Sequence, residues 1–472
     1  STTMHCMPGC EILQSFDLVH WEHVTYVYET LDHTDAQQLK SGQNIYGQGM
    51  WAASLRYHEG RFYICFVAND TRKTYLYTSE KIDGPWKKQL IEGFYHDGSL
   101  LFDEDGRNYI VYGNDEIWIT ELNEDLTAPK KDGLHRLLVS DHKNPELGYE
   151  GSHIQKINGY YYIFLIHSLR DRWMRTEACF YSDSLEGEFT GGDVLCDDRG
   201  YCGQGVAQGG IVDTPDGKWY AMLFQDSGAV GRIPILVPVT WKDHFPVFGQ
   251  NGHVPEEIEV HSTRPGYIYQ PLVGSDDFCN GLLPRWQFNH DPDPRYYHLD
   301  ALQGTYTITT REVCTELTQA VNTLTQRMSY PSCAAEVTVD ASALKEGDVA
   351  GLCALQSCYA AVGITKHHGK YEVLMLDKKE DGILDMTEGT VVESHQMDFR
   401  LEADFCNMKD EARCYYRVNK GDWLPIGTVH KLYFKLDHFT GCRFGLFCYA
   451  AEETGGSACF RDFKYYDVDE IS

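Results

Sequence analysis

A glycine turn followed by an aromatic-rich strand recurs four times in the first half of the chain. The turn glycines are 46, 53 and 58 residues apart. The acidic or amide residue before each glycine is typical of a tight hairpin turn, and the β-branched or aromatic run after it is typical of a strand. A repeat of this length with several strands predicts the blades of a β-propeller. The copies are "EGRFYICFV" with Gly60, "DGRNYIVYG" with Gly106, "NGYYYIFLI" with Gly159 and "DGKWYAMLF" with Gly217.

A second recurring element allows the blades to be counted. It reads "YTSEKIDGPW" up to Trp86 and "YSDSLEGEF" up to Phe189, and it also occurs before the first glycine turn, as "LQSFDLVHWE" around Trp21. That early copy needs an inner strand ahead of it, which the printed sequence does not supply. Four full units and one incomplete unit therefore predict a five-bladed propeller. The alternative is one large antiparallel sandwich with coincidental turns.

The pattern changes near residue 275. Alternating strands such as "YTITT", "CAAEVTVD" and "RFGLFCYA" continue from there to Ser472 without a blade repeat. Their number and spacing predict a β-sandwich of the jelly-roll, concanavalin-A-like kind. Residues 1–274 are therefore assigned to the propeller and residues 275–472 to an accessory sandwich. Long helical periodicity is absent, so the fold class is all-β.

The charge balance argues against nucleic acid and membrane partners. The chain holds 41 basic and 70 acidic residues and has a net charge of −29, so it repels polyphosphates and anionic lipid surfaces. No window resembles the roughly 20 apolar residues of a membrane helix. A neutral substrate fits this composition better.

The sixteen cysteines predict a reduced protein rather than a disulfide framework. Many lie in strand-like runs, including Cys65 and Cys448, where a free cysteine packs as a small apolar side chain. Disulfides persist mainly in oxidising compartments, and no signal peptide is visible, so we expect a cytoplasmic location. The histidines show neither HExxH nor Cys-His spacing, and this opposes a zinc site.

Two carboxylates occupy matching places in neighbouring repeats. Asp97 and Glu150 each stand nine residues before a turn glycine, so we expect both at one end of the propeller channel. Paired carboxylates are the basis of glycoside hydrolysis, in which one group donates a proton to the leaving oxygen. The alternative is that the equal spacing is a coincidence among 70 acidic residues.

The blade sequences resemble glycoside hydrolase family 43. The resemblance is carried by "WAASLRYHEGRFYICF", "HDGSLLFDEDGRNYIVYG", "YEGSHIQKINGYYYIF" and "GAVGRIPILVPVTWKDHFPVFG", and it continues in the second half in "GDVAGLCALQSCYAAVGI". It implies a five-bladed propeller with arabinofuranosidase or β-xylosidase activity, followed by a concanavalin-A-like sandwich. It also implies an inverting reaction with three carboxylates.

The resemblance assigns roles to individual residues. Glu150 of "YEGSH" matches the general acid, and Asp97 of "HDGSL" matches the aspartate that modulates the acid's pKa and positions the substrate. The residues that the resemblance places against the sugar are Trp51, Ala52, His153, Gln208 and Arg232.

Two departures from the family pattern are visible. The general base is expected on the first inner strand, and the printed sequence starts at "STTMHCMPG", past that strand, so we expect no general base within it. Ala207 stands where a channel histidine is expected. No cofactor is required by the resemblance, and no metal ligand is assigned, although a structural calcium ion, for example near "GSDDF", is compatible with it.

The leading functional prediction is release of α-L-arabinofuranosyl residues from plant hemicellulose, with an arabinose- or xylose-containing oligo- or polysaccharide as partner. The alternatives are a β-D-xylosidase or a bifunctional enzyme, because one pocket discriminates weakly between similar pentoses. A non-catalytic sugar-binding propeller is a remoter alternative. A WD-type protein platform is disfavoured because the repeats lack a W-D dipeptide.

Overall fold

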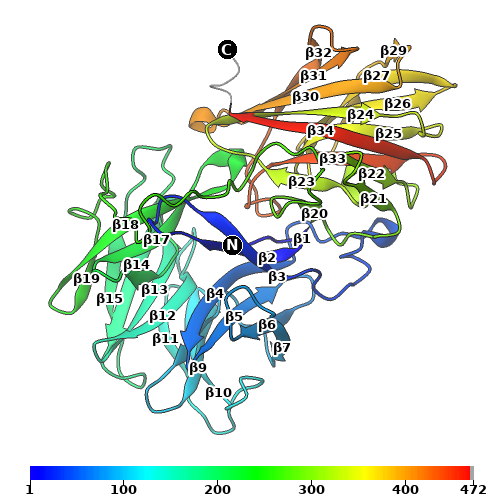
Figure 1. Cartoon of the computed structure of the whole chain (residues 1–472). Coiled ribbons are helices and arrows are strands. Elements are labelled where there is room, and N and C mark those ends of the chain that lie inside the picture. The colour runs from blue at the N-terminus through cyan, green and yellow to red at the C-terminus, as the bar shows by residue number, and fades with distance from the viewer. Residues whose placement is uncertain (468–472) are drawn as a thin grey trace.

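The computed structural model describes residues 1–467, which form two all-β units (Figure 1). Blue to green strands form the propeller, and yellow-green to red strands form most of the sandwich packed against it. No α-helix occurs among the described residues; the only helical pieces are short 3₁₀ turns. A helix able to cross a membrane is likewise not found in residues 1–467. The 3₁₀ turns are η1 (Lys40–Gly42), η2 (Gly228–Val230), η3 (Leu317–Gln319) and η4 (Cys406–Met408).

Four blades are antiparallel sheets of four strands each, in chain order. The first contains β4 (Met50–His58), β5 (Arg61–Ala68), β6 (Lys73–Ser79) and β7 (Lys87–Ile91). The second contains β8 (Ser99–Phe102), β9 (Asn108–Asn114), β10 (Glu116–Leu122) and β11 (His135–Ser140). The third contains β12 (Glu150–Ile157), β13 (Tyr160–Ser168), β14 (Arg175–Ser182) and β15 (Thr190–Leu195). The fourth contains β16 (Ile211–Asp213), β17 (Trp219–Asp226), β18 (Arg232–Lys242) and β19 (Phe245–Phe248).

The repeated motif forms the hairpin between the first two strands of each blade. All four turn glycines have positive φ, between 79° and 85°, a conformation that glycine adopts without steric cost. The strand after each turn is the second in its sheet and packs between neighbouring blades. Its side chains are therefore buried on both faces, as in β13, which explains the continuous apolar run in place of strict alternation.

The prediction of five blades is wrong for this structure. The segment assigned to the incomplete unit forms only a two-stranded sheet of β2 (Gly9–Gln14) and β3 (Glu22–Tyr28). No other strand of residues 1–467 pairs with β2 on its second edge, and the nearby β1 (Cys6–Met7) pairs elsewhere. The β2–β3 sheet packs on the first blade through Ile12, Val27 and Phe66, so it shares one apolar core with that blade.

The second unit is a sandwich of two sheets around one large apolar core. Every cysteine of the chain is a free thiol, and most are buried, several of them in these strands and in the blades, as expected for small apolar side chains. One sheet contains β20 (Gln287–Asn289), β23 (Leu324–Arg327), β25 (Asp348–Leu355), β26 (Tyr359–His367), β27 (Lys370–Lys378), β28 (Leu384–Met386), β29 (Thr390–Val392) and β33 (Arg443–Ala450), with β1 at its edge. The other contains β21 (Tyr297–Asp300), β22 (Thr305–Thr309), β24 (Ser332–Asp340), β30 (Gln396–Asp404), β31 (Glu411–Val418), β32 (Leu424–Lys431) and β34 (Ser457–Asp467).

Residues near the start of the chain join the two units through backbone hydrogen bonds. Strand β1 pairs antiparallel with β20, with Cys6 opposite Asn289. Two residues earlier, Met4 exchanges backbone hydrogen bonds with Met50 of β4, at 3.1 and 3.2 Å. This short segment is therefore hydrogen-bonded to a blade on one side and to the sandwich on the other.

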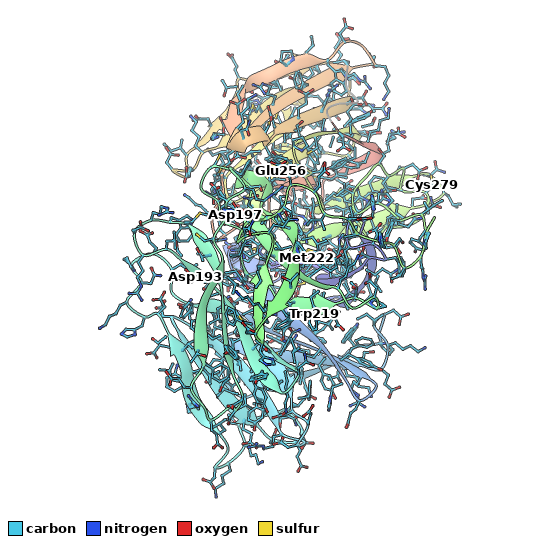
Figure 2. All side chains as sticks on the ribbon, turned by 90° about the vertical axis from the view of Figure 1, so that its left-hand side faces the viewer. Asp193, Asp197, Trp219, Met222, Glu256 and Cys279 are labelled. Atoms are coloured by element: carbon cyan, nitrogen blue, oxygen red, sulfur yellow. The ribbon has the colours of Figure 1, made fainter. Side chains whose placement is uncertain are left out.

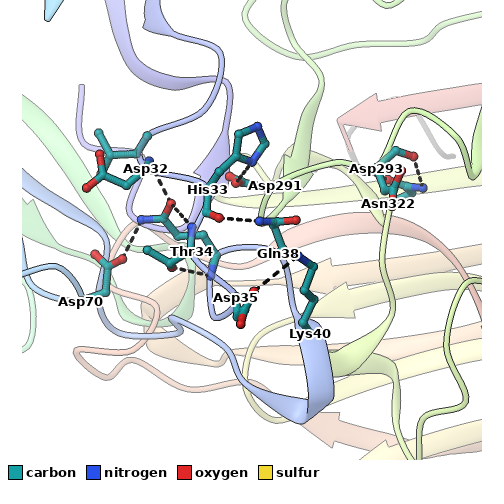
Figure 3. Close-up of polar contacts among 12 residues, drawn as sticks. Asp32, His33, Thr34, Asp35, Gln38, Lys40, Asp70, Asp291, Asp293 and Asn322 are labelled. Carbon is teal, nitrogen blue, oxygen red and sulfur yellow. Dashed lines mark hydrogen bonds and ion pairs between the residues drawn. The ribbon is translucent and has the colours of Figure 1, made fainter.

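The loop after β3 adds polar contacts to the same interface (Figure 3). His33 Nδ1 lies 2.7 Å from Asp291 Oδ2 of the sandwich, and Asp291 N donates to the carbonyl of Gln37 at 2.8 Å. The Gln37 side chain donates to Asp70 Oδ2 of the first blade at 2.7 Å. The loop therefore has hydrogen-bond partners in both units.

Three buried histidines pack together where β1, the sandwich and the loop before β33 meet. The rings of His290 and His438 lie 4.9 and 5.2 Å from the ring of His5, measured between centroids. Tyr46 packs against all three. Burial lowers the pKa of His5 and of His438 to about 3, and it lowers the pKa of His290 well below its usual range. The interface therefore holds these three imidazoles in their neutral form.

Acid should weaken this interface. An unfolded histidine binds a proton below about pH 6.5, whereas His438 in the folded protein does not, so stability is lost as the pH falls through that value. We expect the unfolding free energy of the parent, relative to His438→Gln, to drop by about 1.4 kcal/mol per pH unit between pH 6 and pH 4. Urea unfolding at several pH values measures this difference. The control is His298→Gln, at an exposed histidine. Parallel pH profiles of unfolding free energy for the parent and for His438→Gln would contradict the prediction.

Candidate functional site

The structure brings Asp97 and Glu150 together at one mouth of the ring. Asp97 lies just before β8, and Glu150 is the first residue of β12. One carboxylate oxygen of each, together with a ring nitrogen of His96, lies within 4.8 Å of the others. The inner strand β12 has an irregular register between Glu150 and His153, and such bulges redirect side chains near functional sites.

Asp97 is held in a strained, buried place. Its φ is +47°, which is uncommon outside glycine. Gly151 N donates to its Oδ2 at 3.1 Å, and Ser152 Oγ donates to its carbonyl oxygen at 2.8 Å. Burial raises the pKa of Asp97 to about 6; His96 and Arg232 act against this rise, and the nearby Glu150 charge adds to it.

Glu150 has two polar neighbours. Asn114 Nδ2 donates to Glu150 Oε2 at 2.9 Å, and His96 Nε2 lies 3.6 Å from the same oxygen. The other carboxylate oxygen is not engaged in any hydrogen bond within residues 1–467, and the side chain is 21% exposed. Glu150 therefore presents one oriented, partly accessible carboxyl at the mouth of the ring.

Arg232 enters the same mouth from β18. Its guanidinium lies between the rings of Phe224 and Phe439, 4.3 Å from each centroid, and its Nε lies 3.4 Å from Asp226 Oδ1. Burial lowers the pKa of Arg232 to about 10, which leaves it charged at neutral pH. This is a fixed cation with aromatic support, suited to orienting a polar ligand.

The sandwich contributes a side chain to this mouth. Phe439, on the loop before β33, packs edge-on against Trp51 with ring centroids 5.6 Å apart. The loop is fixed by Cys442 N, which donates to the carbonyl of Ala229 at 2.8 Å, and by Gly441, whose backbone abuts Gly231. The site therefore includes residues of both units.

The predicted residues Ala52, His153 and Gln208 lie deeper. They line a cavity of about 10 Å³ beneath Asp97, roughly the space of one water molecule. Burial lowers the pKa of His153 to about 3, so it is neutral there. Gln208 Nε2 lies 3.4 Å from Asp97 Oδ2. At this depth Ala52, His153 and Gln208 are better placed to support Asp97 than to contact a sugar directly.

Sequence reasoning missed His96 and Phe439. His96 directly precedes Asp97, and that adjacency was the available signal. Phe439 carried no local signal, because its role depends on how the sandwich packs against the ring.

We assign no metal to this site. His96, Asp97 and Glu150 form the one cluster of three potential ligands in the part of the chain that the structure describes, but Glu150 is already oriented by the Asn114 amide and Asp97 by Gly151 N. In the segment where calcium was considered, Asp276 accepts hydrogen bonds from Phe278 N and Trp286 Nε1, at 2.8 Å each.

An apolar slot lies beside the free edge of β2. Its volume is about 860 Å³, and it is bordered by β2, β4, β17, β18 and the segment after β19. Met222 of β17 and Glu256 of that segment line it and are labelled in Figure 2. Further lining residues are Ile12, Leu13, Leu55, Ile235, Val260 and Leu272. A slot of this lining next to an unpaired strand is suited to an extended peptide.

Two family profiles together match most of the chain. That of glycosyl hydrolases family 43 matches residues 1–246. That of the beta xylosidase C-terminal concanavalin A-like domain matches residues 275–466. The first covers the β2–β3 sheet and the four blades, and the second covers nearly all of the sandwich.

Individual relatives carry several names. A beta-xylosidase of Formosa agariphila is 25% identical, over 99% of this chain and 85% of the relative. A non-reducing end α-L-arabinofuranosidase of Bacteroides ovatus is 22% identical, over 82% of this chain and 75% of the relative. The solved structure of a bifunctional GH43-CE protein of Bacteroides eggerthii is 42% identical, with a TM-score of 0.91 over 99% of this chain. This chain spans 60% of the length of that protein.

Burial of Asp97 should cost stability when the carboxylate is charged. Its pKa of about 6 exceeds the unfolded value of about 3.9, so the folded protein loses stability as the pH rises through this window. We expect Asp97→Asn to gain about 3 kcal/mol relative to the parent between pH 4 and pH 7. Chemical unfolding at both pH values tests this, with the exposed Asp83→Asn as control. Equal gains at pH 4 and pH 7 would contradict it.

Proposed function

The chain belongs to glycosyl hydrolases family 43, and we propose that it is an exo-acting, inverting enzyme that releases α-L-arabinofuranosyl residues from plant hemicellulose or its oligosaccharides. The observation that carries the proposal is the pairing of buried Asp97 with partly accessible Glu150 at the mouth of the ring. The pair faces the Arg232 guanidinium, and Phe439 of the sandwich closes one side.

Glu150 is the proton donor in this proposal. It has a free carboxylate oxygen and is partly accessible, so it can reach the glycosidic oxygen of a bound sugar. Its O–H bond breaks as the leaving group departs. Asp97 lies close enough to Glu150 for the two carboxyl groups to interact, and this supports a role for Asp97 in modulating the acid.

Asp97 is too close to Glu150 to serve as the general base of an inverting enzyme. The acid and base of such enzymes stand about 6.5–9.5 Å apart, to leave room for the attacking water, whereas oxygens of Asp97 and Glu150 lie within 4.8 Å. This supports the role of Asp97 as modulator of the acid's pKa and positioner of the substrate.

The carboxylate that activates water is proposed to come from an extended segment in the slot beside β2. Among residues 1–467 no third carboxylate joins the Asp97–Glu150 cluster; Asp226, near Arg232, is paired with Arg175 and Arg232. A strand added to the free edge of β2 would also extend the two-stranded sheet toward the size of the other blades.

A β-D-xylosidase, or an enzyme with both activities, is the second candidate. The beta-xylosidase of Formosa agariphila, similar over 99% of this chain, supports it. The two sugars present similar hydroxyls to a single pocket. A sugar-binding propeller without catalysis is the third candidate, and it predicts saturable pentose binding with no release of reducing sugar.

We also propose where the reaction takes place and what it requires. The free thiols support a reducing, cytoplasmic compartment. The proposed acid–base chemistry uses side chains alone and needs no cofactor.

The first test is hydrolysis of p-nitrophenyl α-L-arabinofuranoside and β-D-xyloside in parallel. We expect turnover of the arabinoside to exceed that of the xyloside. Asp97→Asn should lower kcat/KM by at least about 100-fold, because general acid–base machinery contributes 10²–10⁴-fold. Glu150→Gln should lose less on these activated leaving groups than on an arabinoxylo-oligosaccharide. Higher xyloside turnover would favour the second candidate, and binding of pentoses without turnover would favour the third.

Phe439→Ala tests the contribution of the sandwich. The substitution removes one of the two aromatic faces that hold Arg232 and one wall of the site, so we expect kcat/KM to fall about tenfold or more. Phe439→Tyr, which keeps the ring, serves as the matched control. Thermal unfolding of both variants shows whether the domain interface survives. Unchanged kinetics in a folded Phe439→Ala protein would contradict the assignment.

A further inference from the structure

His96 stands between the two carboxylates of the site. Its Nε2 lies 3.7 Å from Asp97 Oδ2 and 3.6 Å from Glu150 Oε2. That nitrogen is buried and has no hydrogen-bond partner among residues 1–467, although the side chain as a whole is 18% exposed. A small adjustment would convert either contact into a hydrogen bond, and catalytic hydrogen bonds commonly tighten in this way when a ligand binds.

The groups around His96 decide its charge. The carboxylates of Asp97 and Glu150 face it, and the guanidinium of Arg72 acts on it with the opposite sign. The ring of Trp51 lies 6.0 Å from the His96 ring between centroids, and the Asn114 amide donates to the Glu150 oxygen that faces His96. Burial acts to lower the pKa of His96, but the two carboxylates outweigh burial and the pKa is raised.

We propose that His96 and Glu150 share one proton, so that His96 is a positioning residue that keeps the general acid loaded. The inference rests on the proposed role of Glu150 as proton donor. With one proton between them, the proton lies either on Glu150 Oε2 or on His96 Nε2. The shared proton dissociates only at the pKa of the pair as a whole, and this pKa lies above the pKa of an isolated carboxyl.

The sharing also explains how the acid is recharged. In turnover the Glu150 O–H bond breaks and the glycosidic oxygen takes the proton as its bond to the anomeric carbon breaks. Glu150 is then a carboxylate and His96 a neutral imidazole without a proton on Nε2. One proton enters from solvent through the partly exposed Glu150 carboxyl, is shared with His96 Nε2, and restores the one-proton pair.

A titration of the His96 ring by NMR tests the inference without turnover. In the full chain, we expect the pKa of His96 to fall by about one unit in Glu150→Gln, because the partner charge is removed. His96→Gln identifies the resonance. An unchanged His96 pKa in Glu150→Gln would overturn the proposal, whatever the enzymatic activity.

The pH profile provides the second arm. For an arabinoxylo-oligosaccharide, the alkaline limb of kcat/KM should move down by about one pH unit in His96→Gln, because Glu150 then ionises as an isolated acid. The shift should be smaller with a p-nitrophenyl leaving group, which needs less protonation. A variant that lost activity at every pH alike would reduce His96 to a structural role and overturn the proposal. Absence of hydrolysis by the parent would contradict the proposed function, while the ring titration would still decide the role of His96.

Discussion

The approach of two backbones at Gly231 and Gly441 determines how the site is built. Both glycines have positive φ, and a side chain on either would lie within 2.7 Å of the other segment's backbone. The contact lets the Cys442 N–H bond the carbonyl of Ala229, in the turn just ahead of β18. Arg232 and Phe439 are each within two residues of this contact, so their stacking follows from it. A side chain larger than hydrogen would separate the sandwich from the ring at this point.

The chemistry of the mouth depends on low solvent access. Burial raises the pKa of Asp97 and makes its charged form unfavourable. Gly151, Arg232 and His96 partly offset this effect. The same burial strengthens the interaction between Asp97 and Glu150, since charges interact more strongly away from water. The instability of the site and the proton transfer proposed for it therefore have one cause.

Much of the fold could be predicted because it is local. The four glycine turns specify four hairpins, and each hairpin forms the start of one blade. The equal offset of Asp97 and Glu150 from those turns was enough to place them at one end of the ring. The glycosidase family was identifiable from the same segments.

The missed features depend on contacts distant in sequence. Phe439 reaches the site only through the packing of the sandwich, which no spacing in the propeller reveals. The number of blades was overestimated because the motif at Trp21 marks the end of a blade and does not reveal how many strands precede it. In residues 1–467 that sheet contains two strands, β2 and β3. The assignment of residues 1–274 to one unit could not foresee that β1 pairs with β20.

That pairing bears on how such a protein can change during evolution. A strand from the first seven residues is part of a sheet whose other strands come from residues 287–450. Exchange of the sandwich for an unrelated domain would leave β1 without its partner and Met4 bound on one side alone. The two halves are therefore expected to be inherited and recombined together, as one unit of selection, in spite of their separate cores.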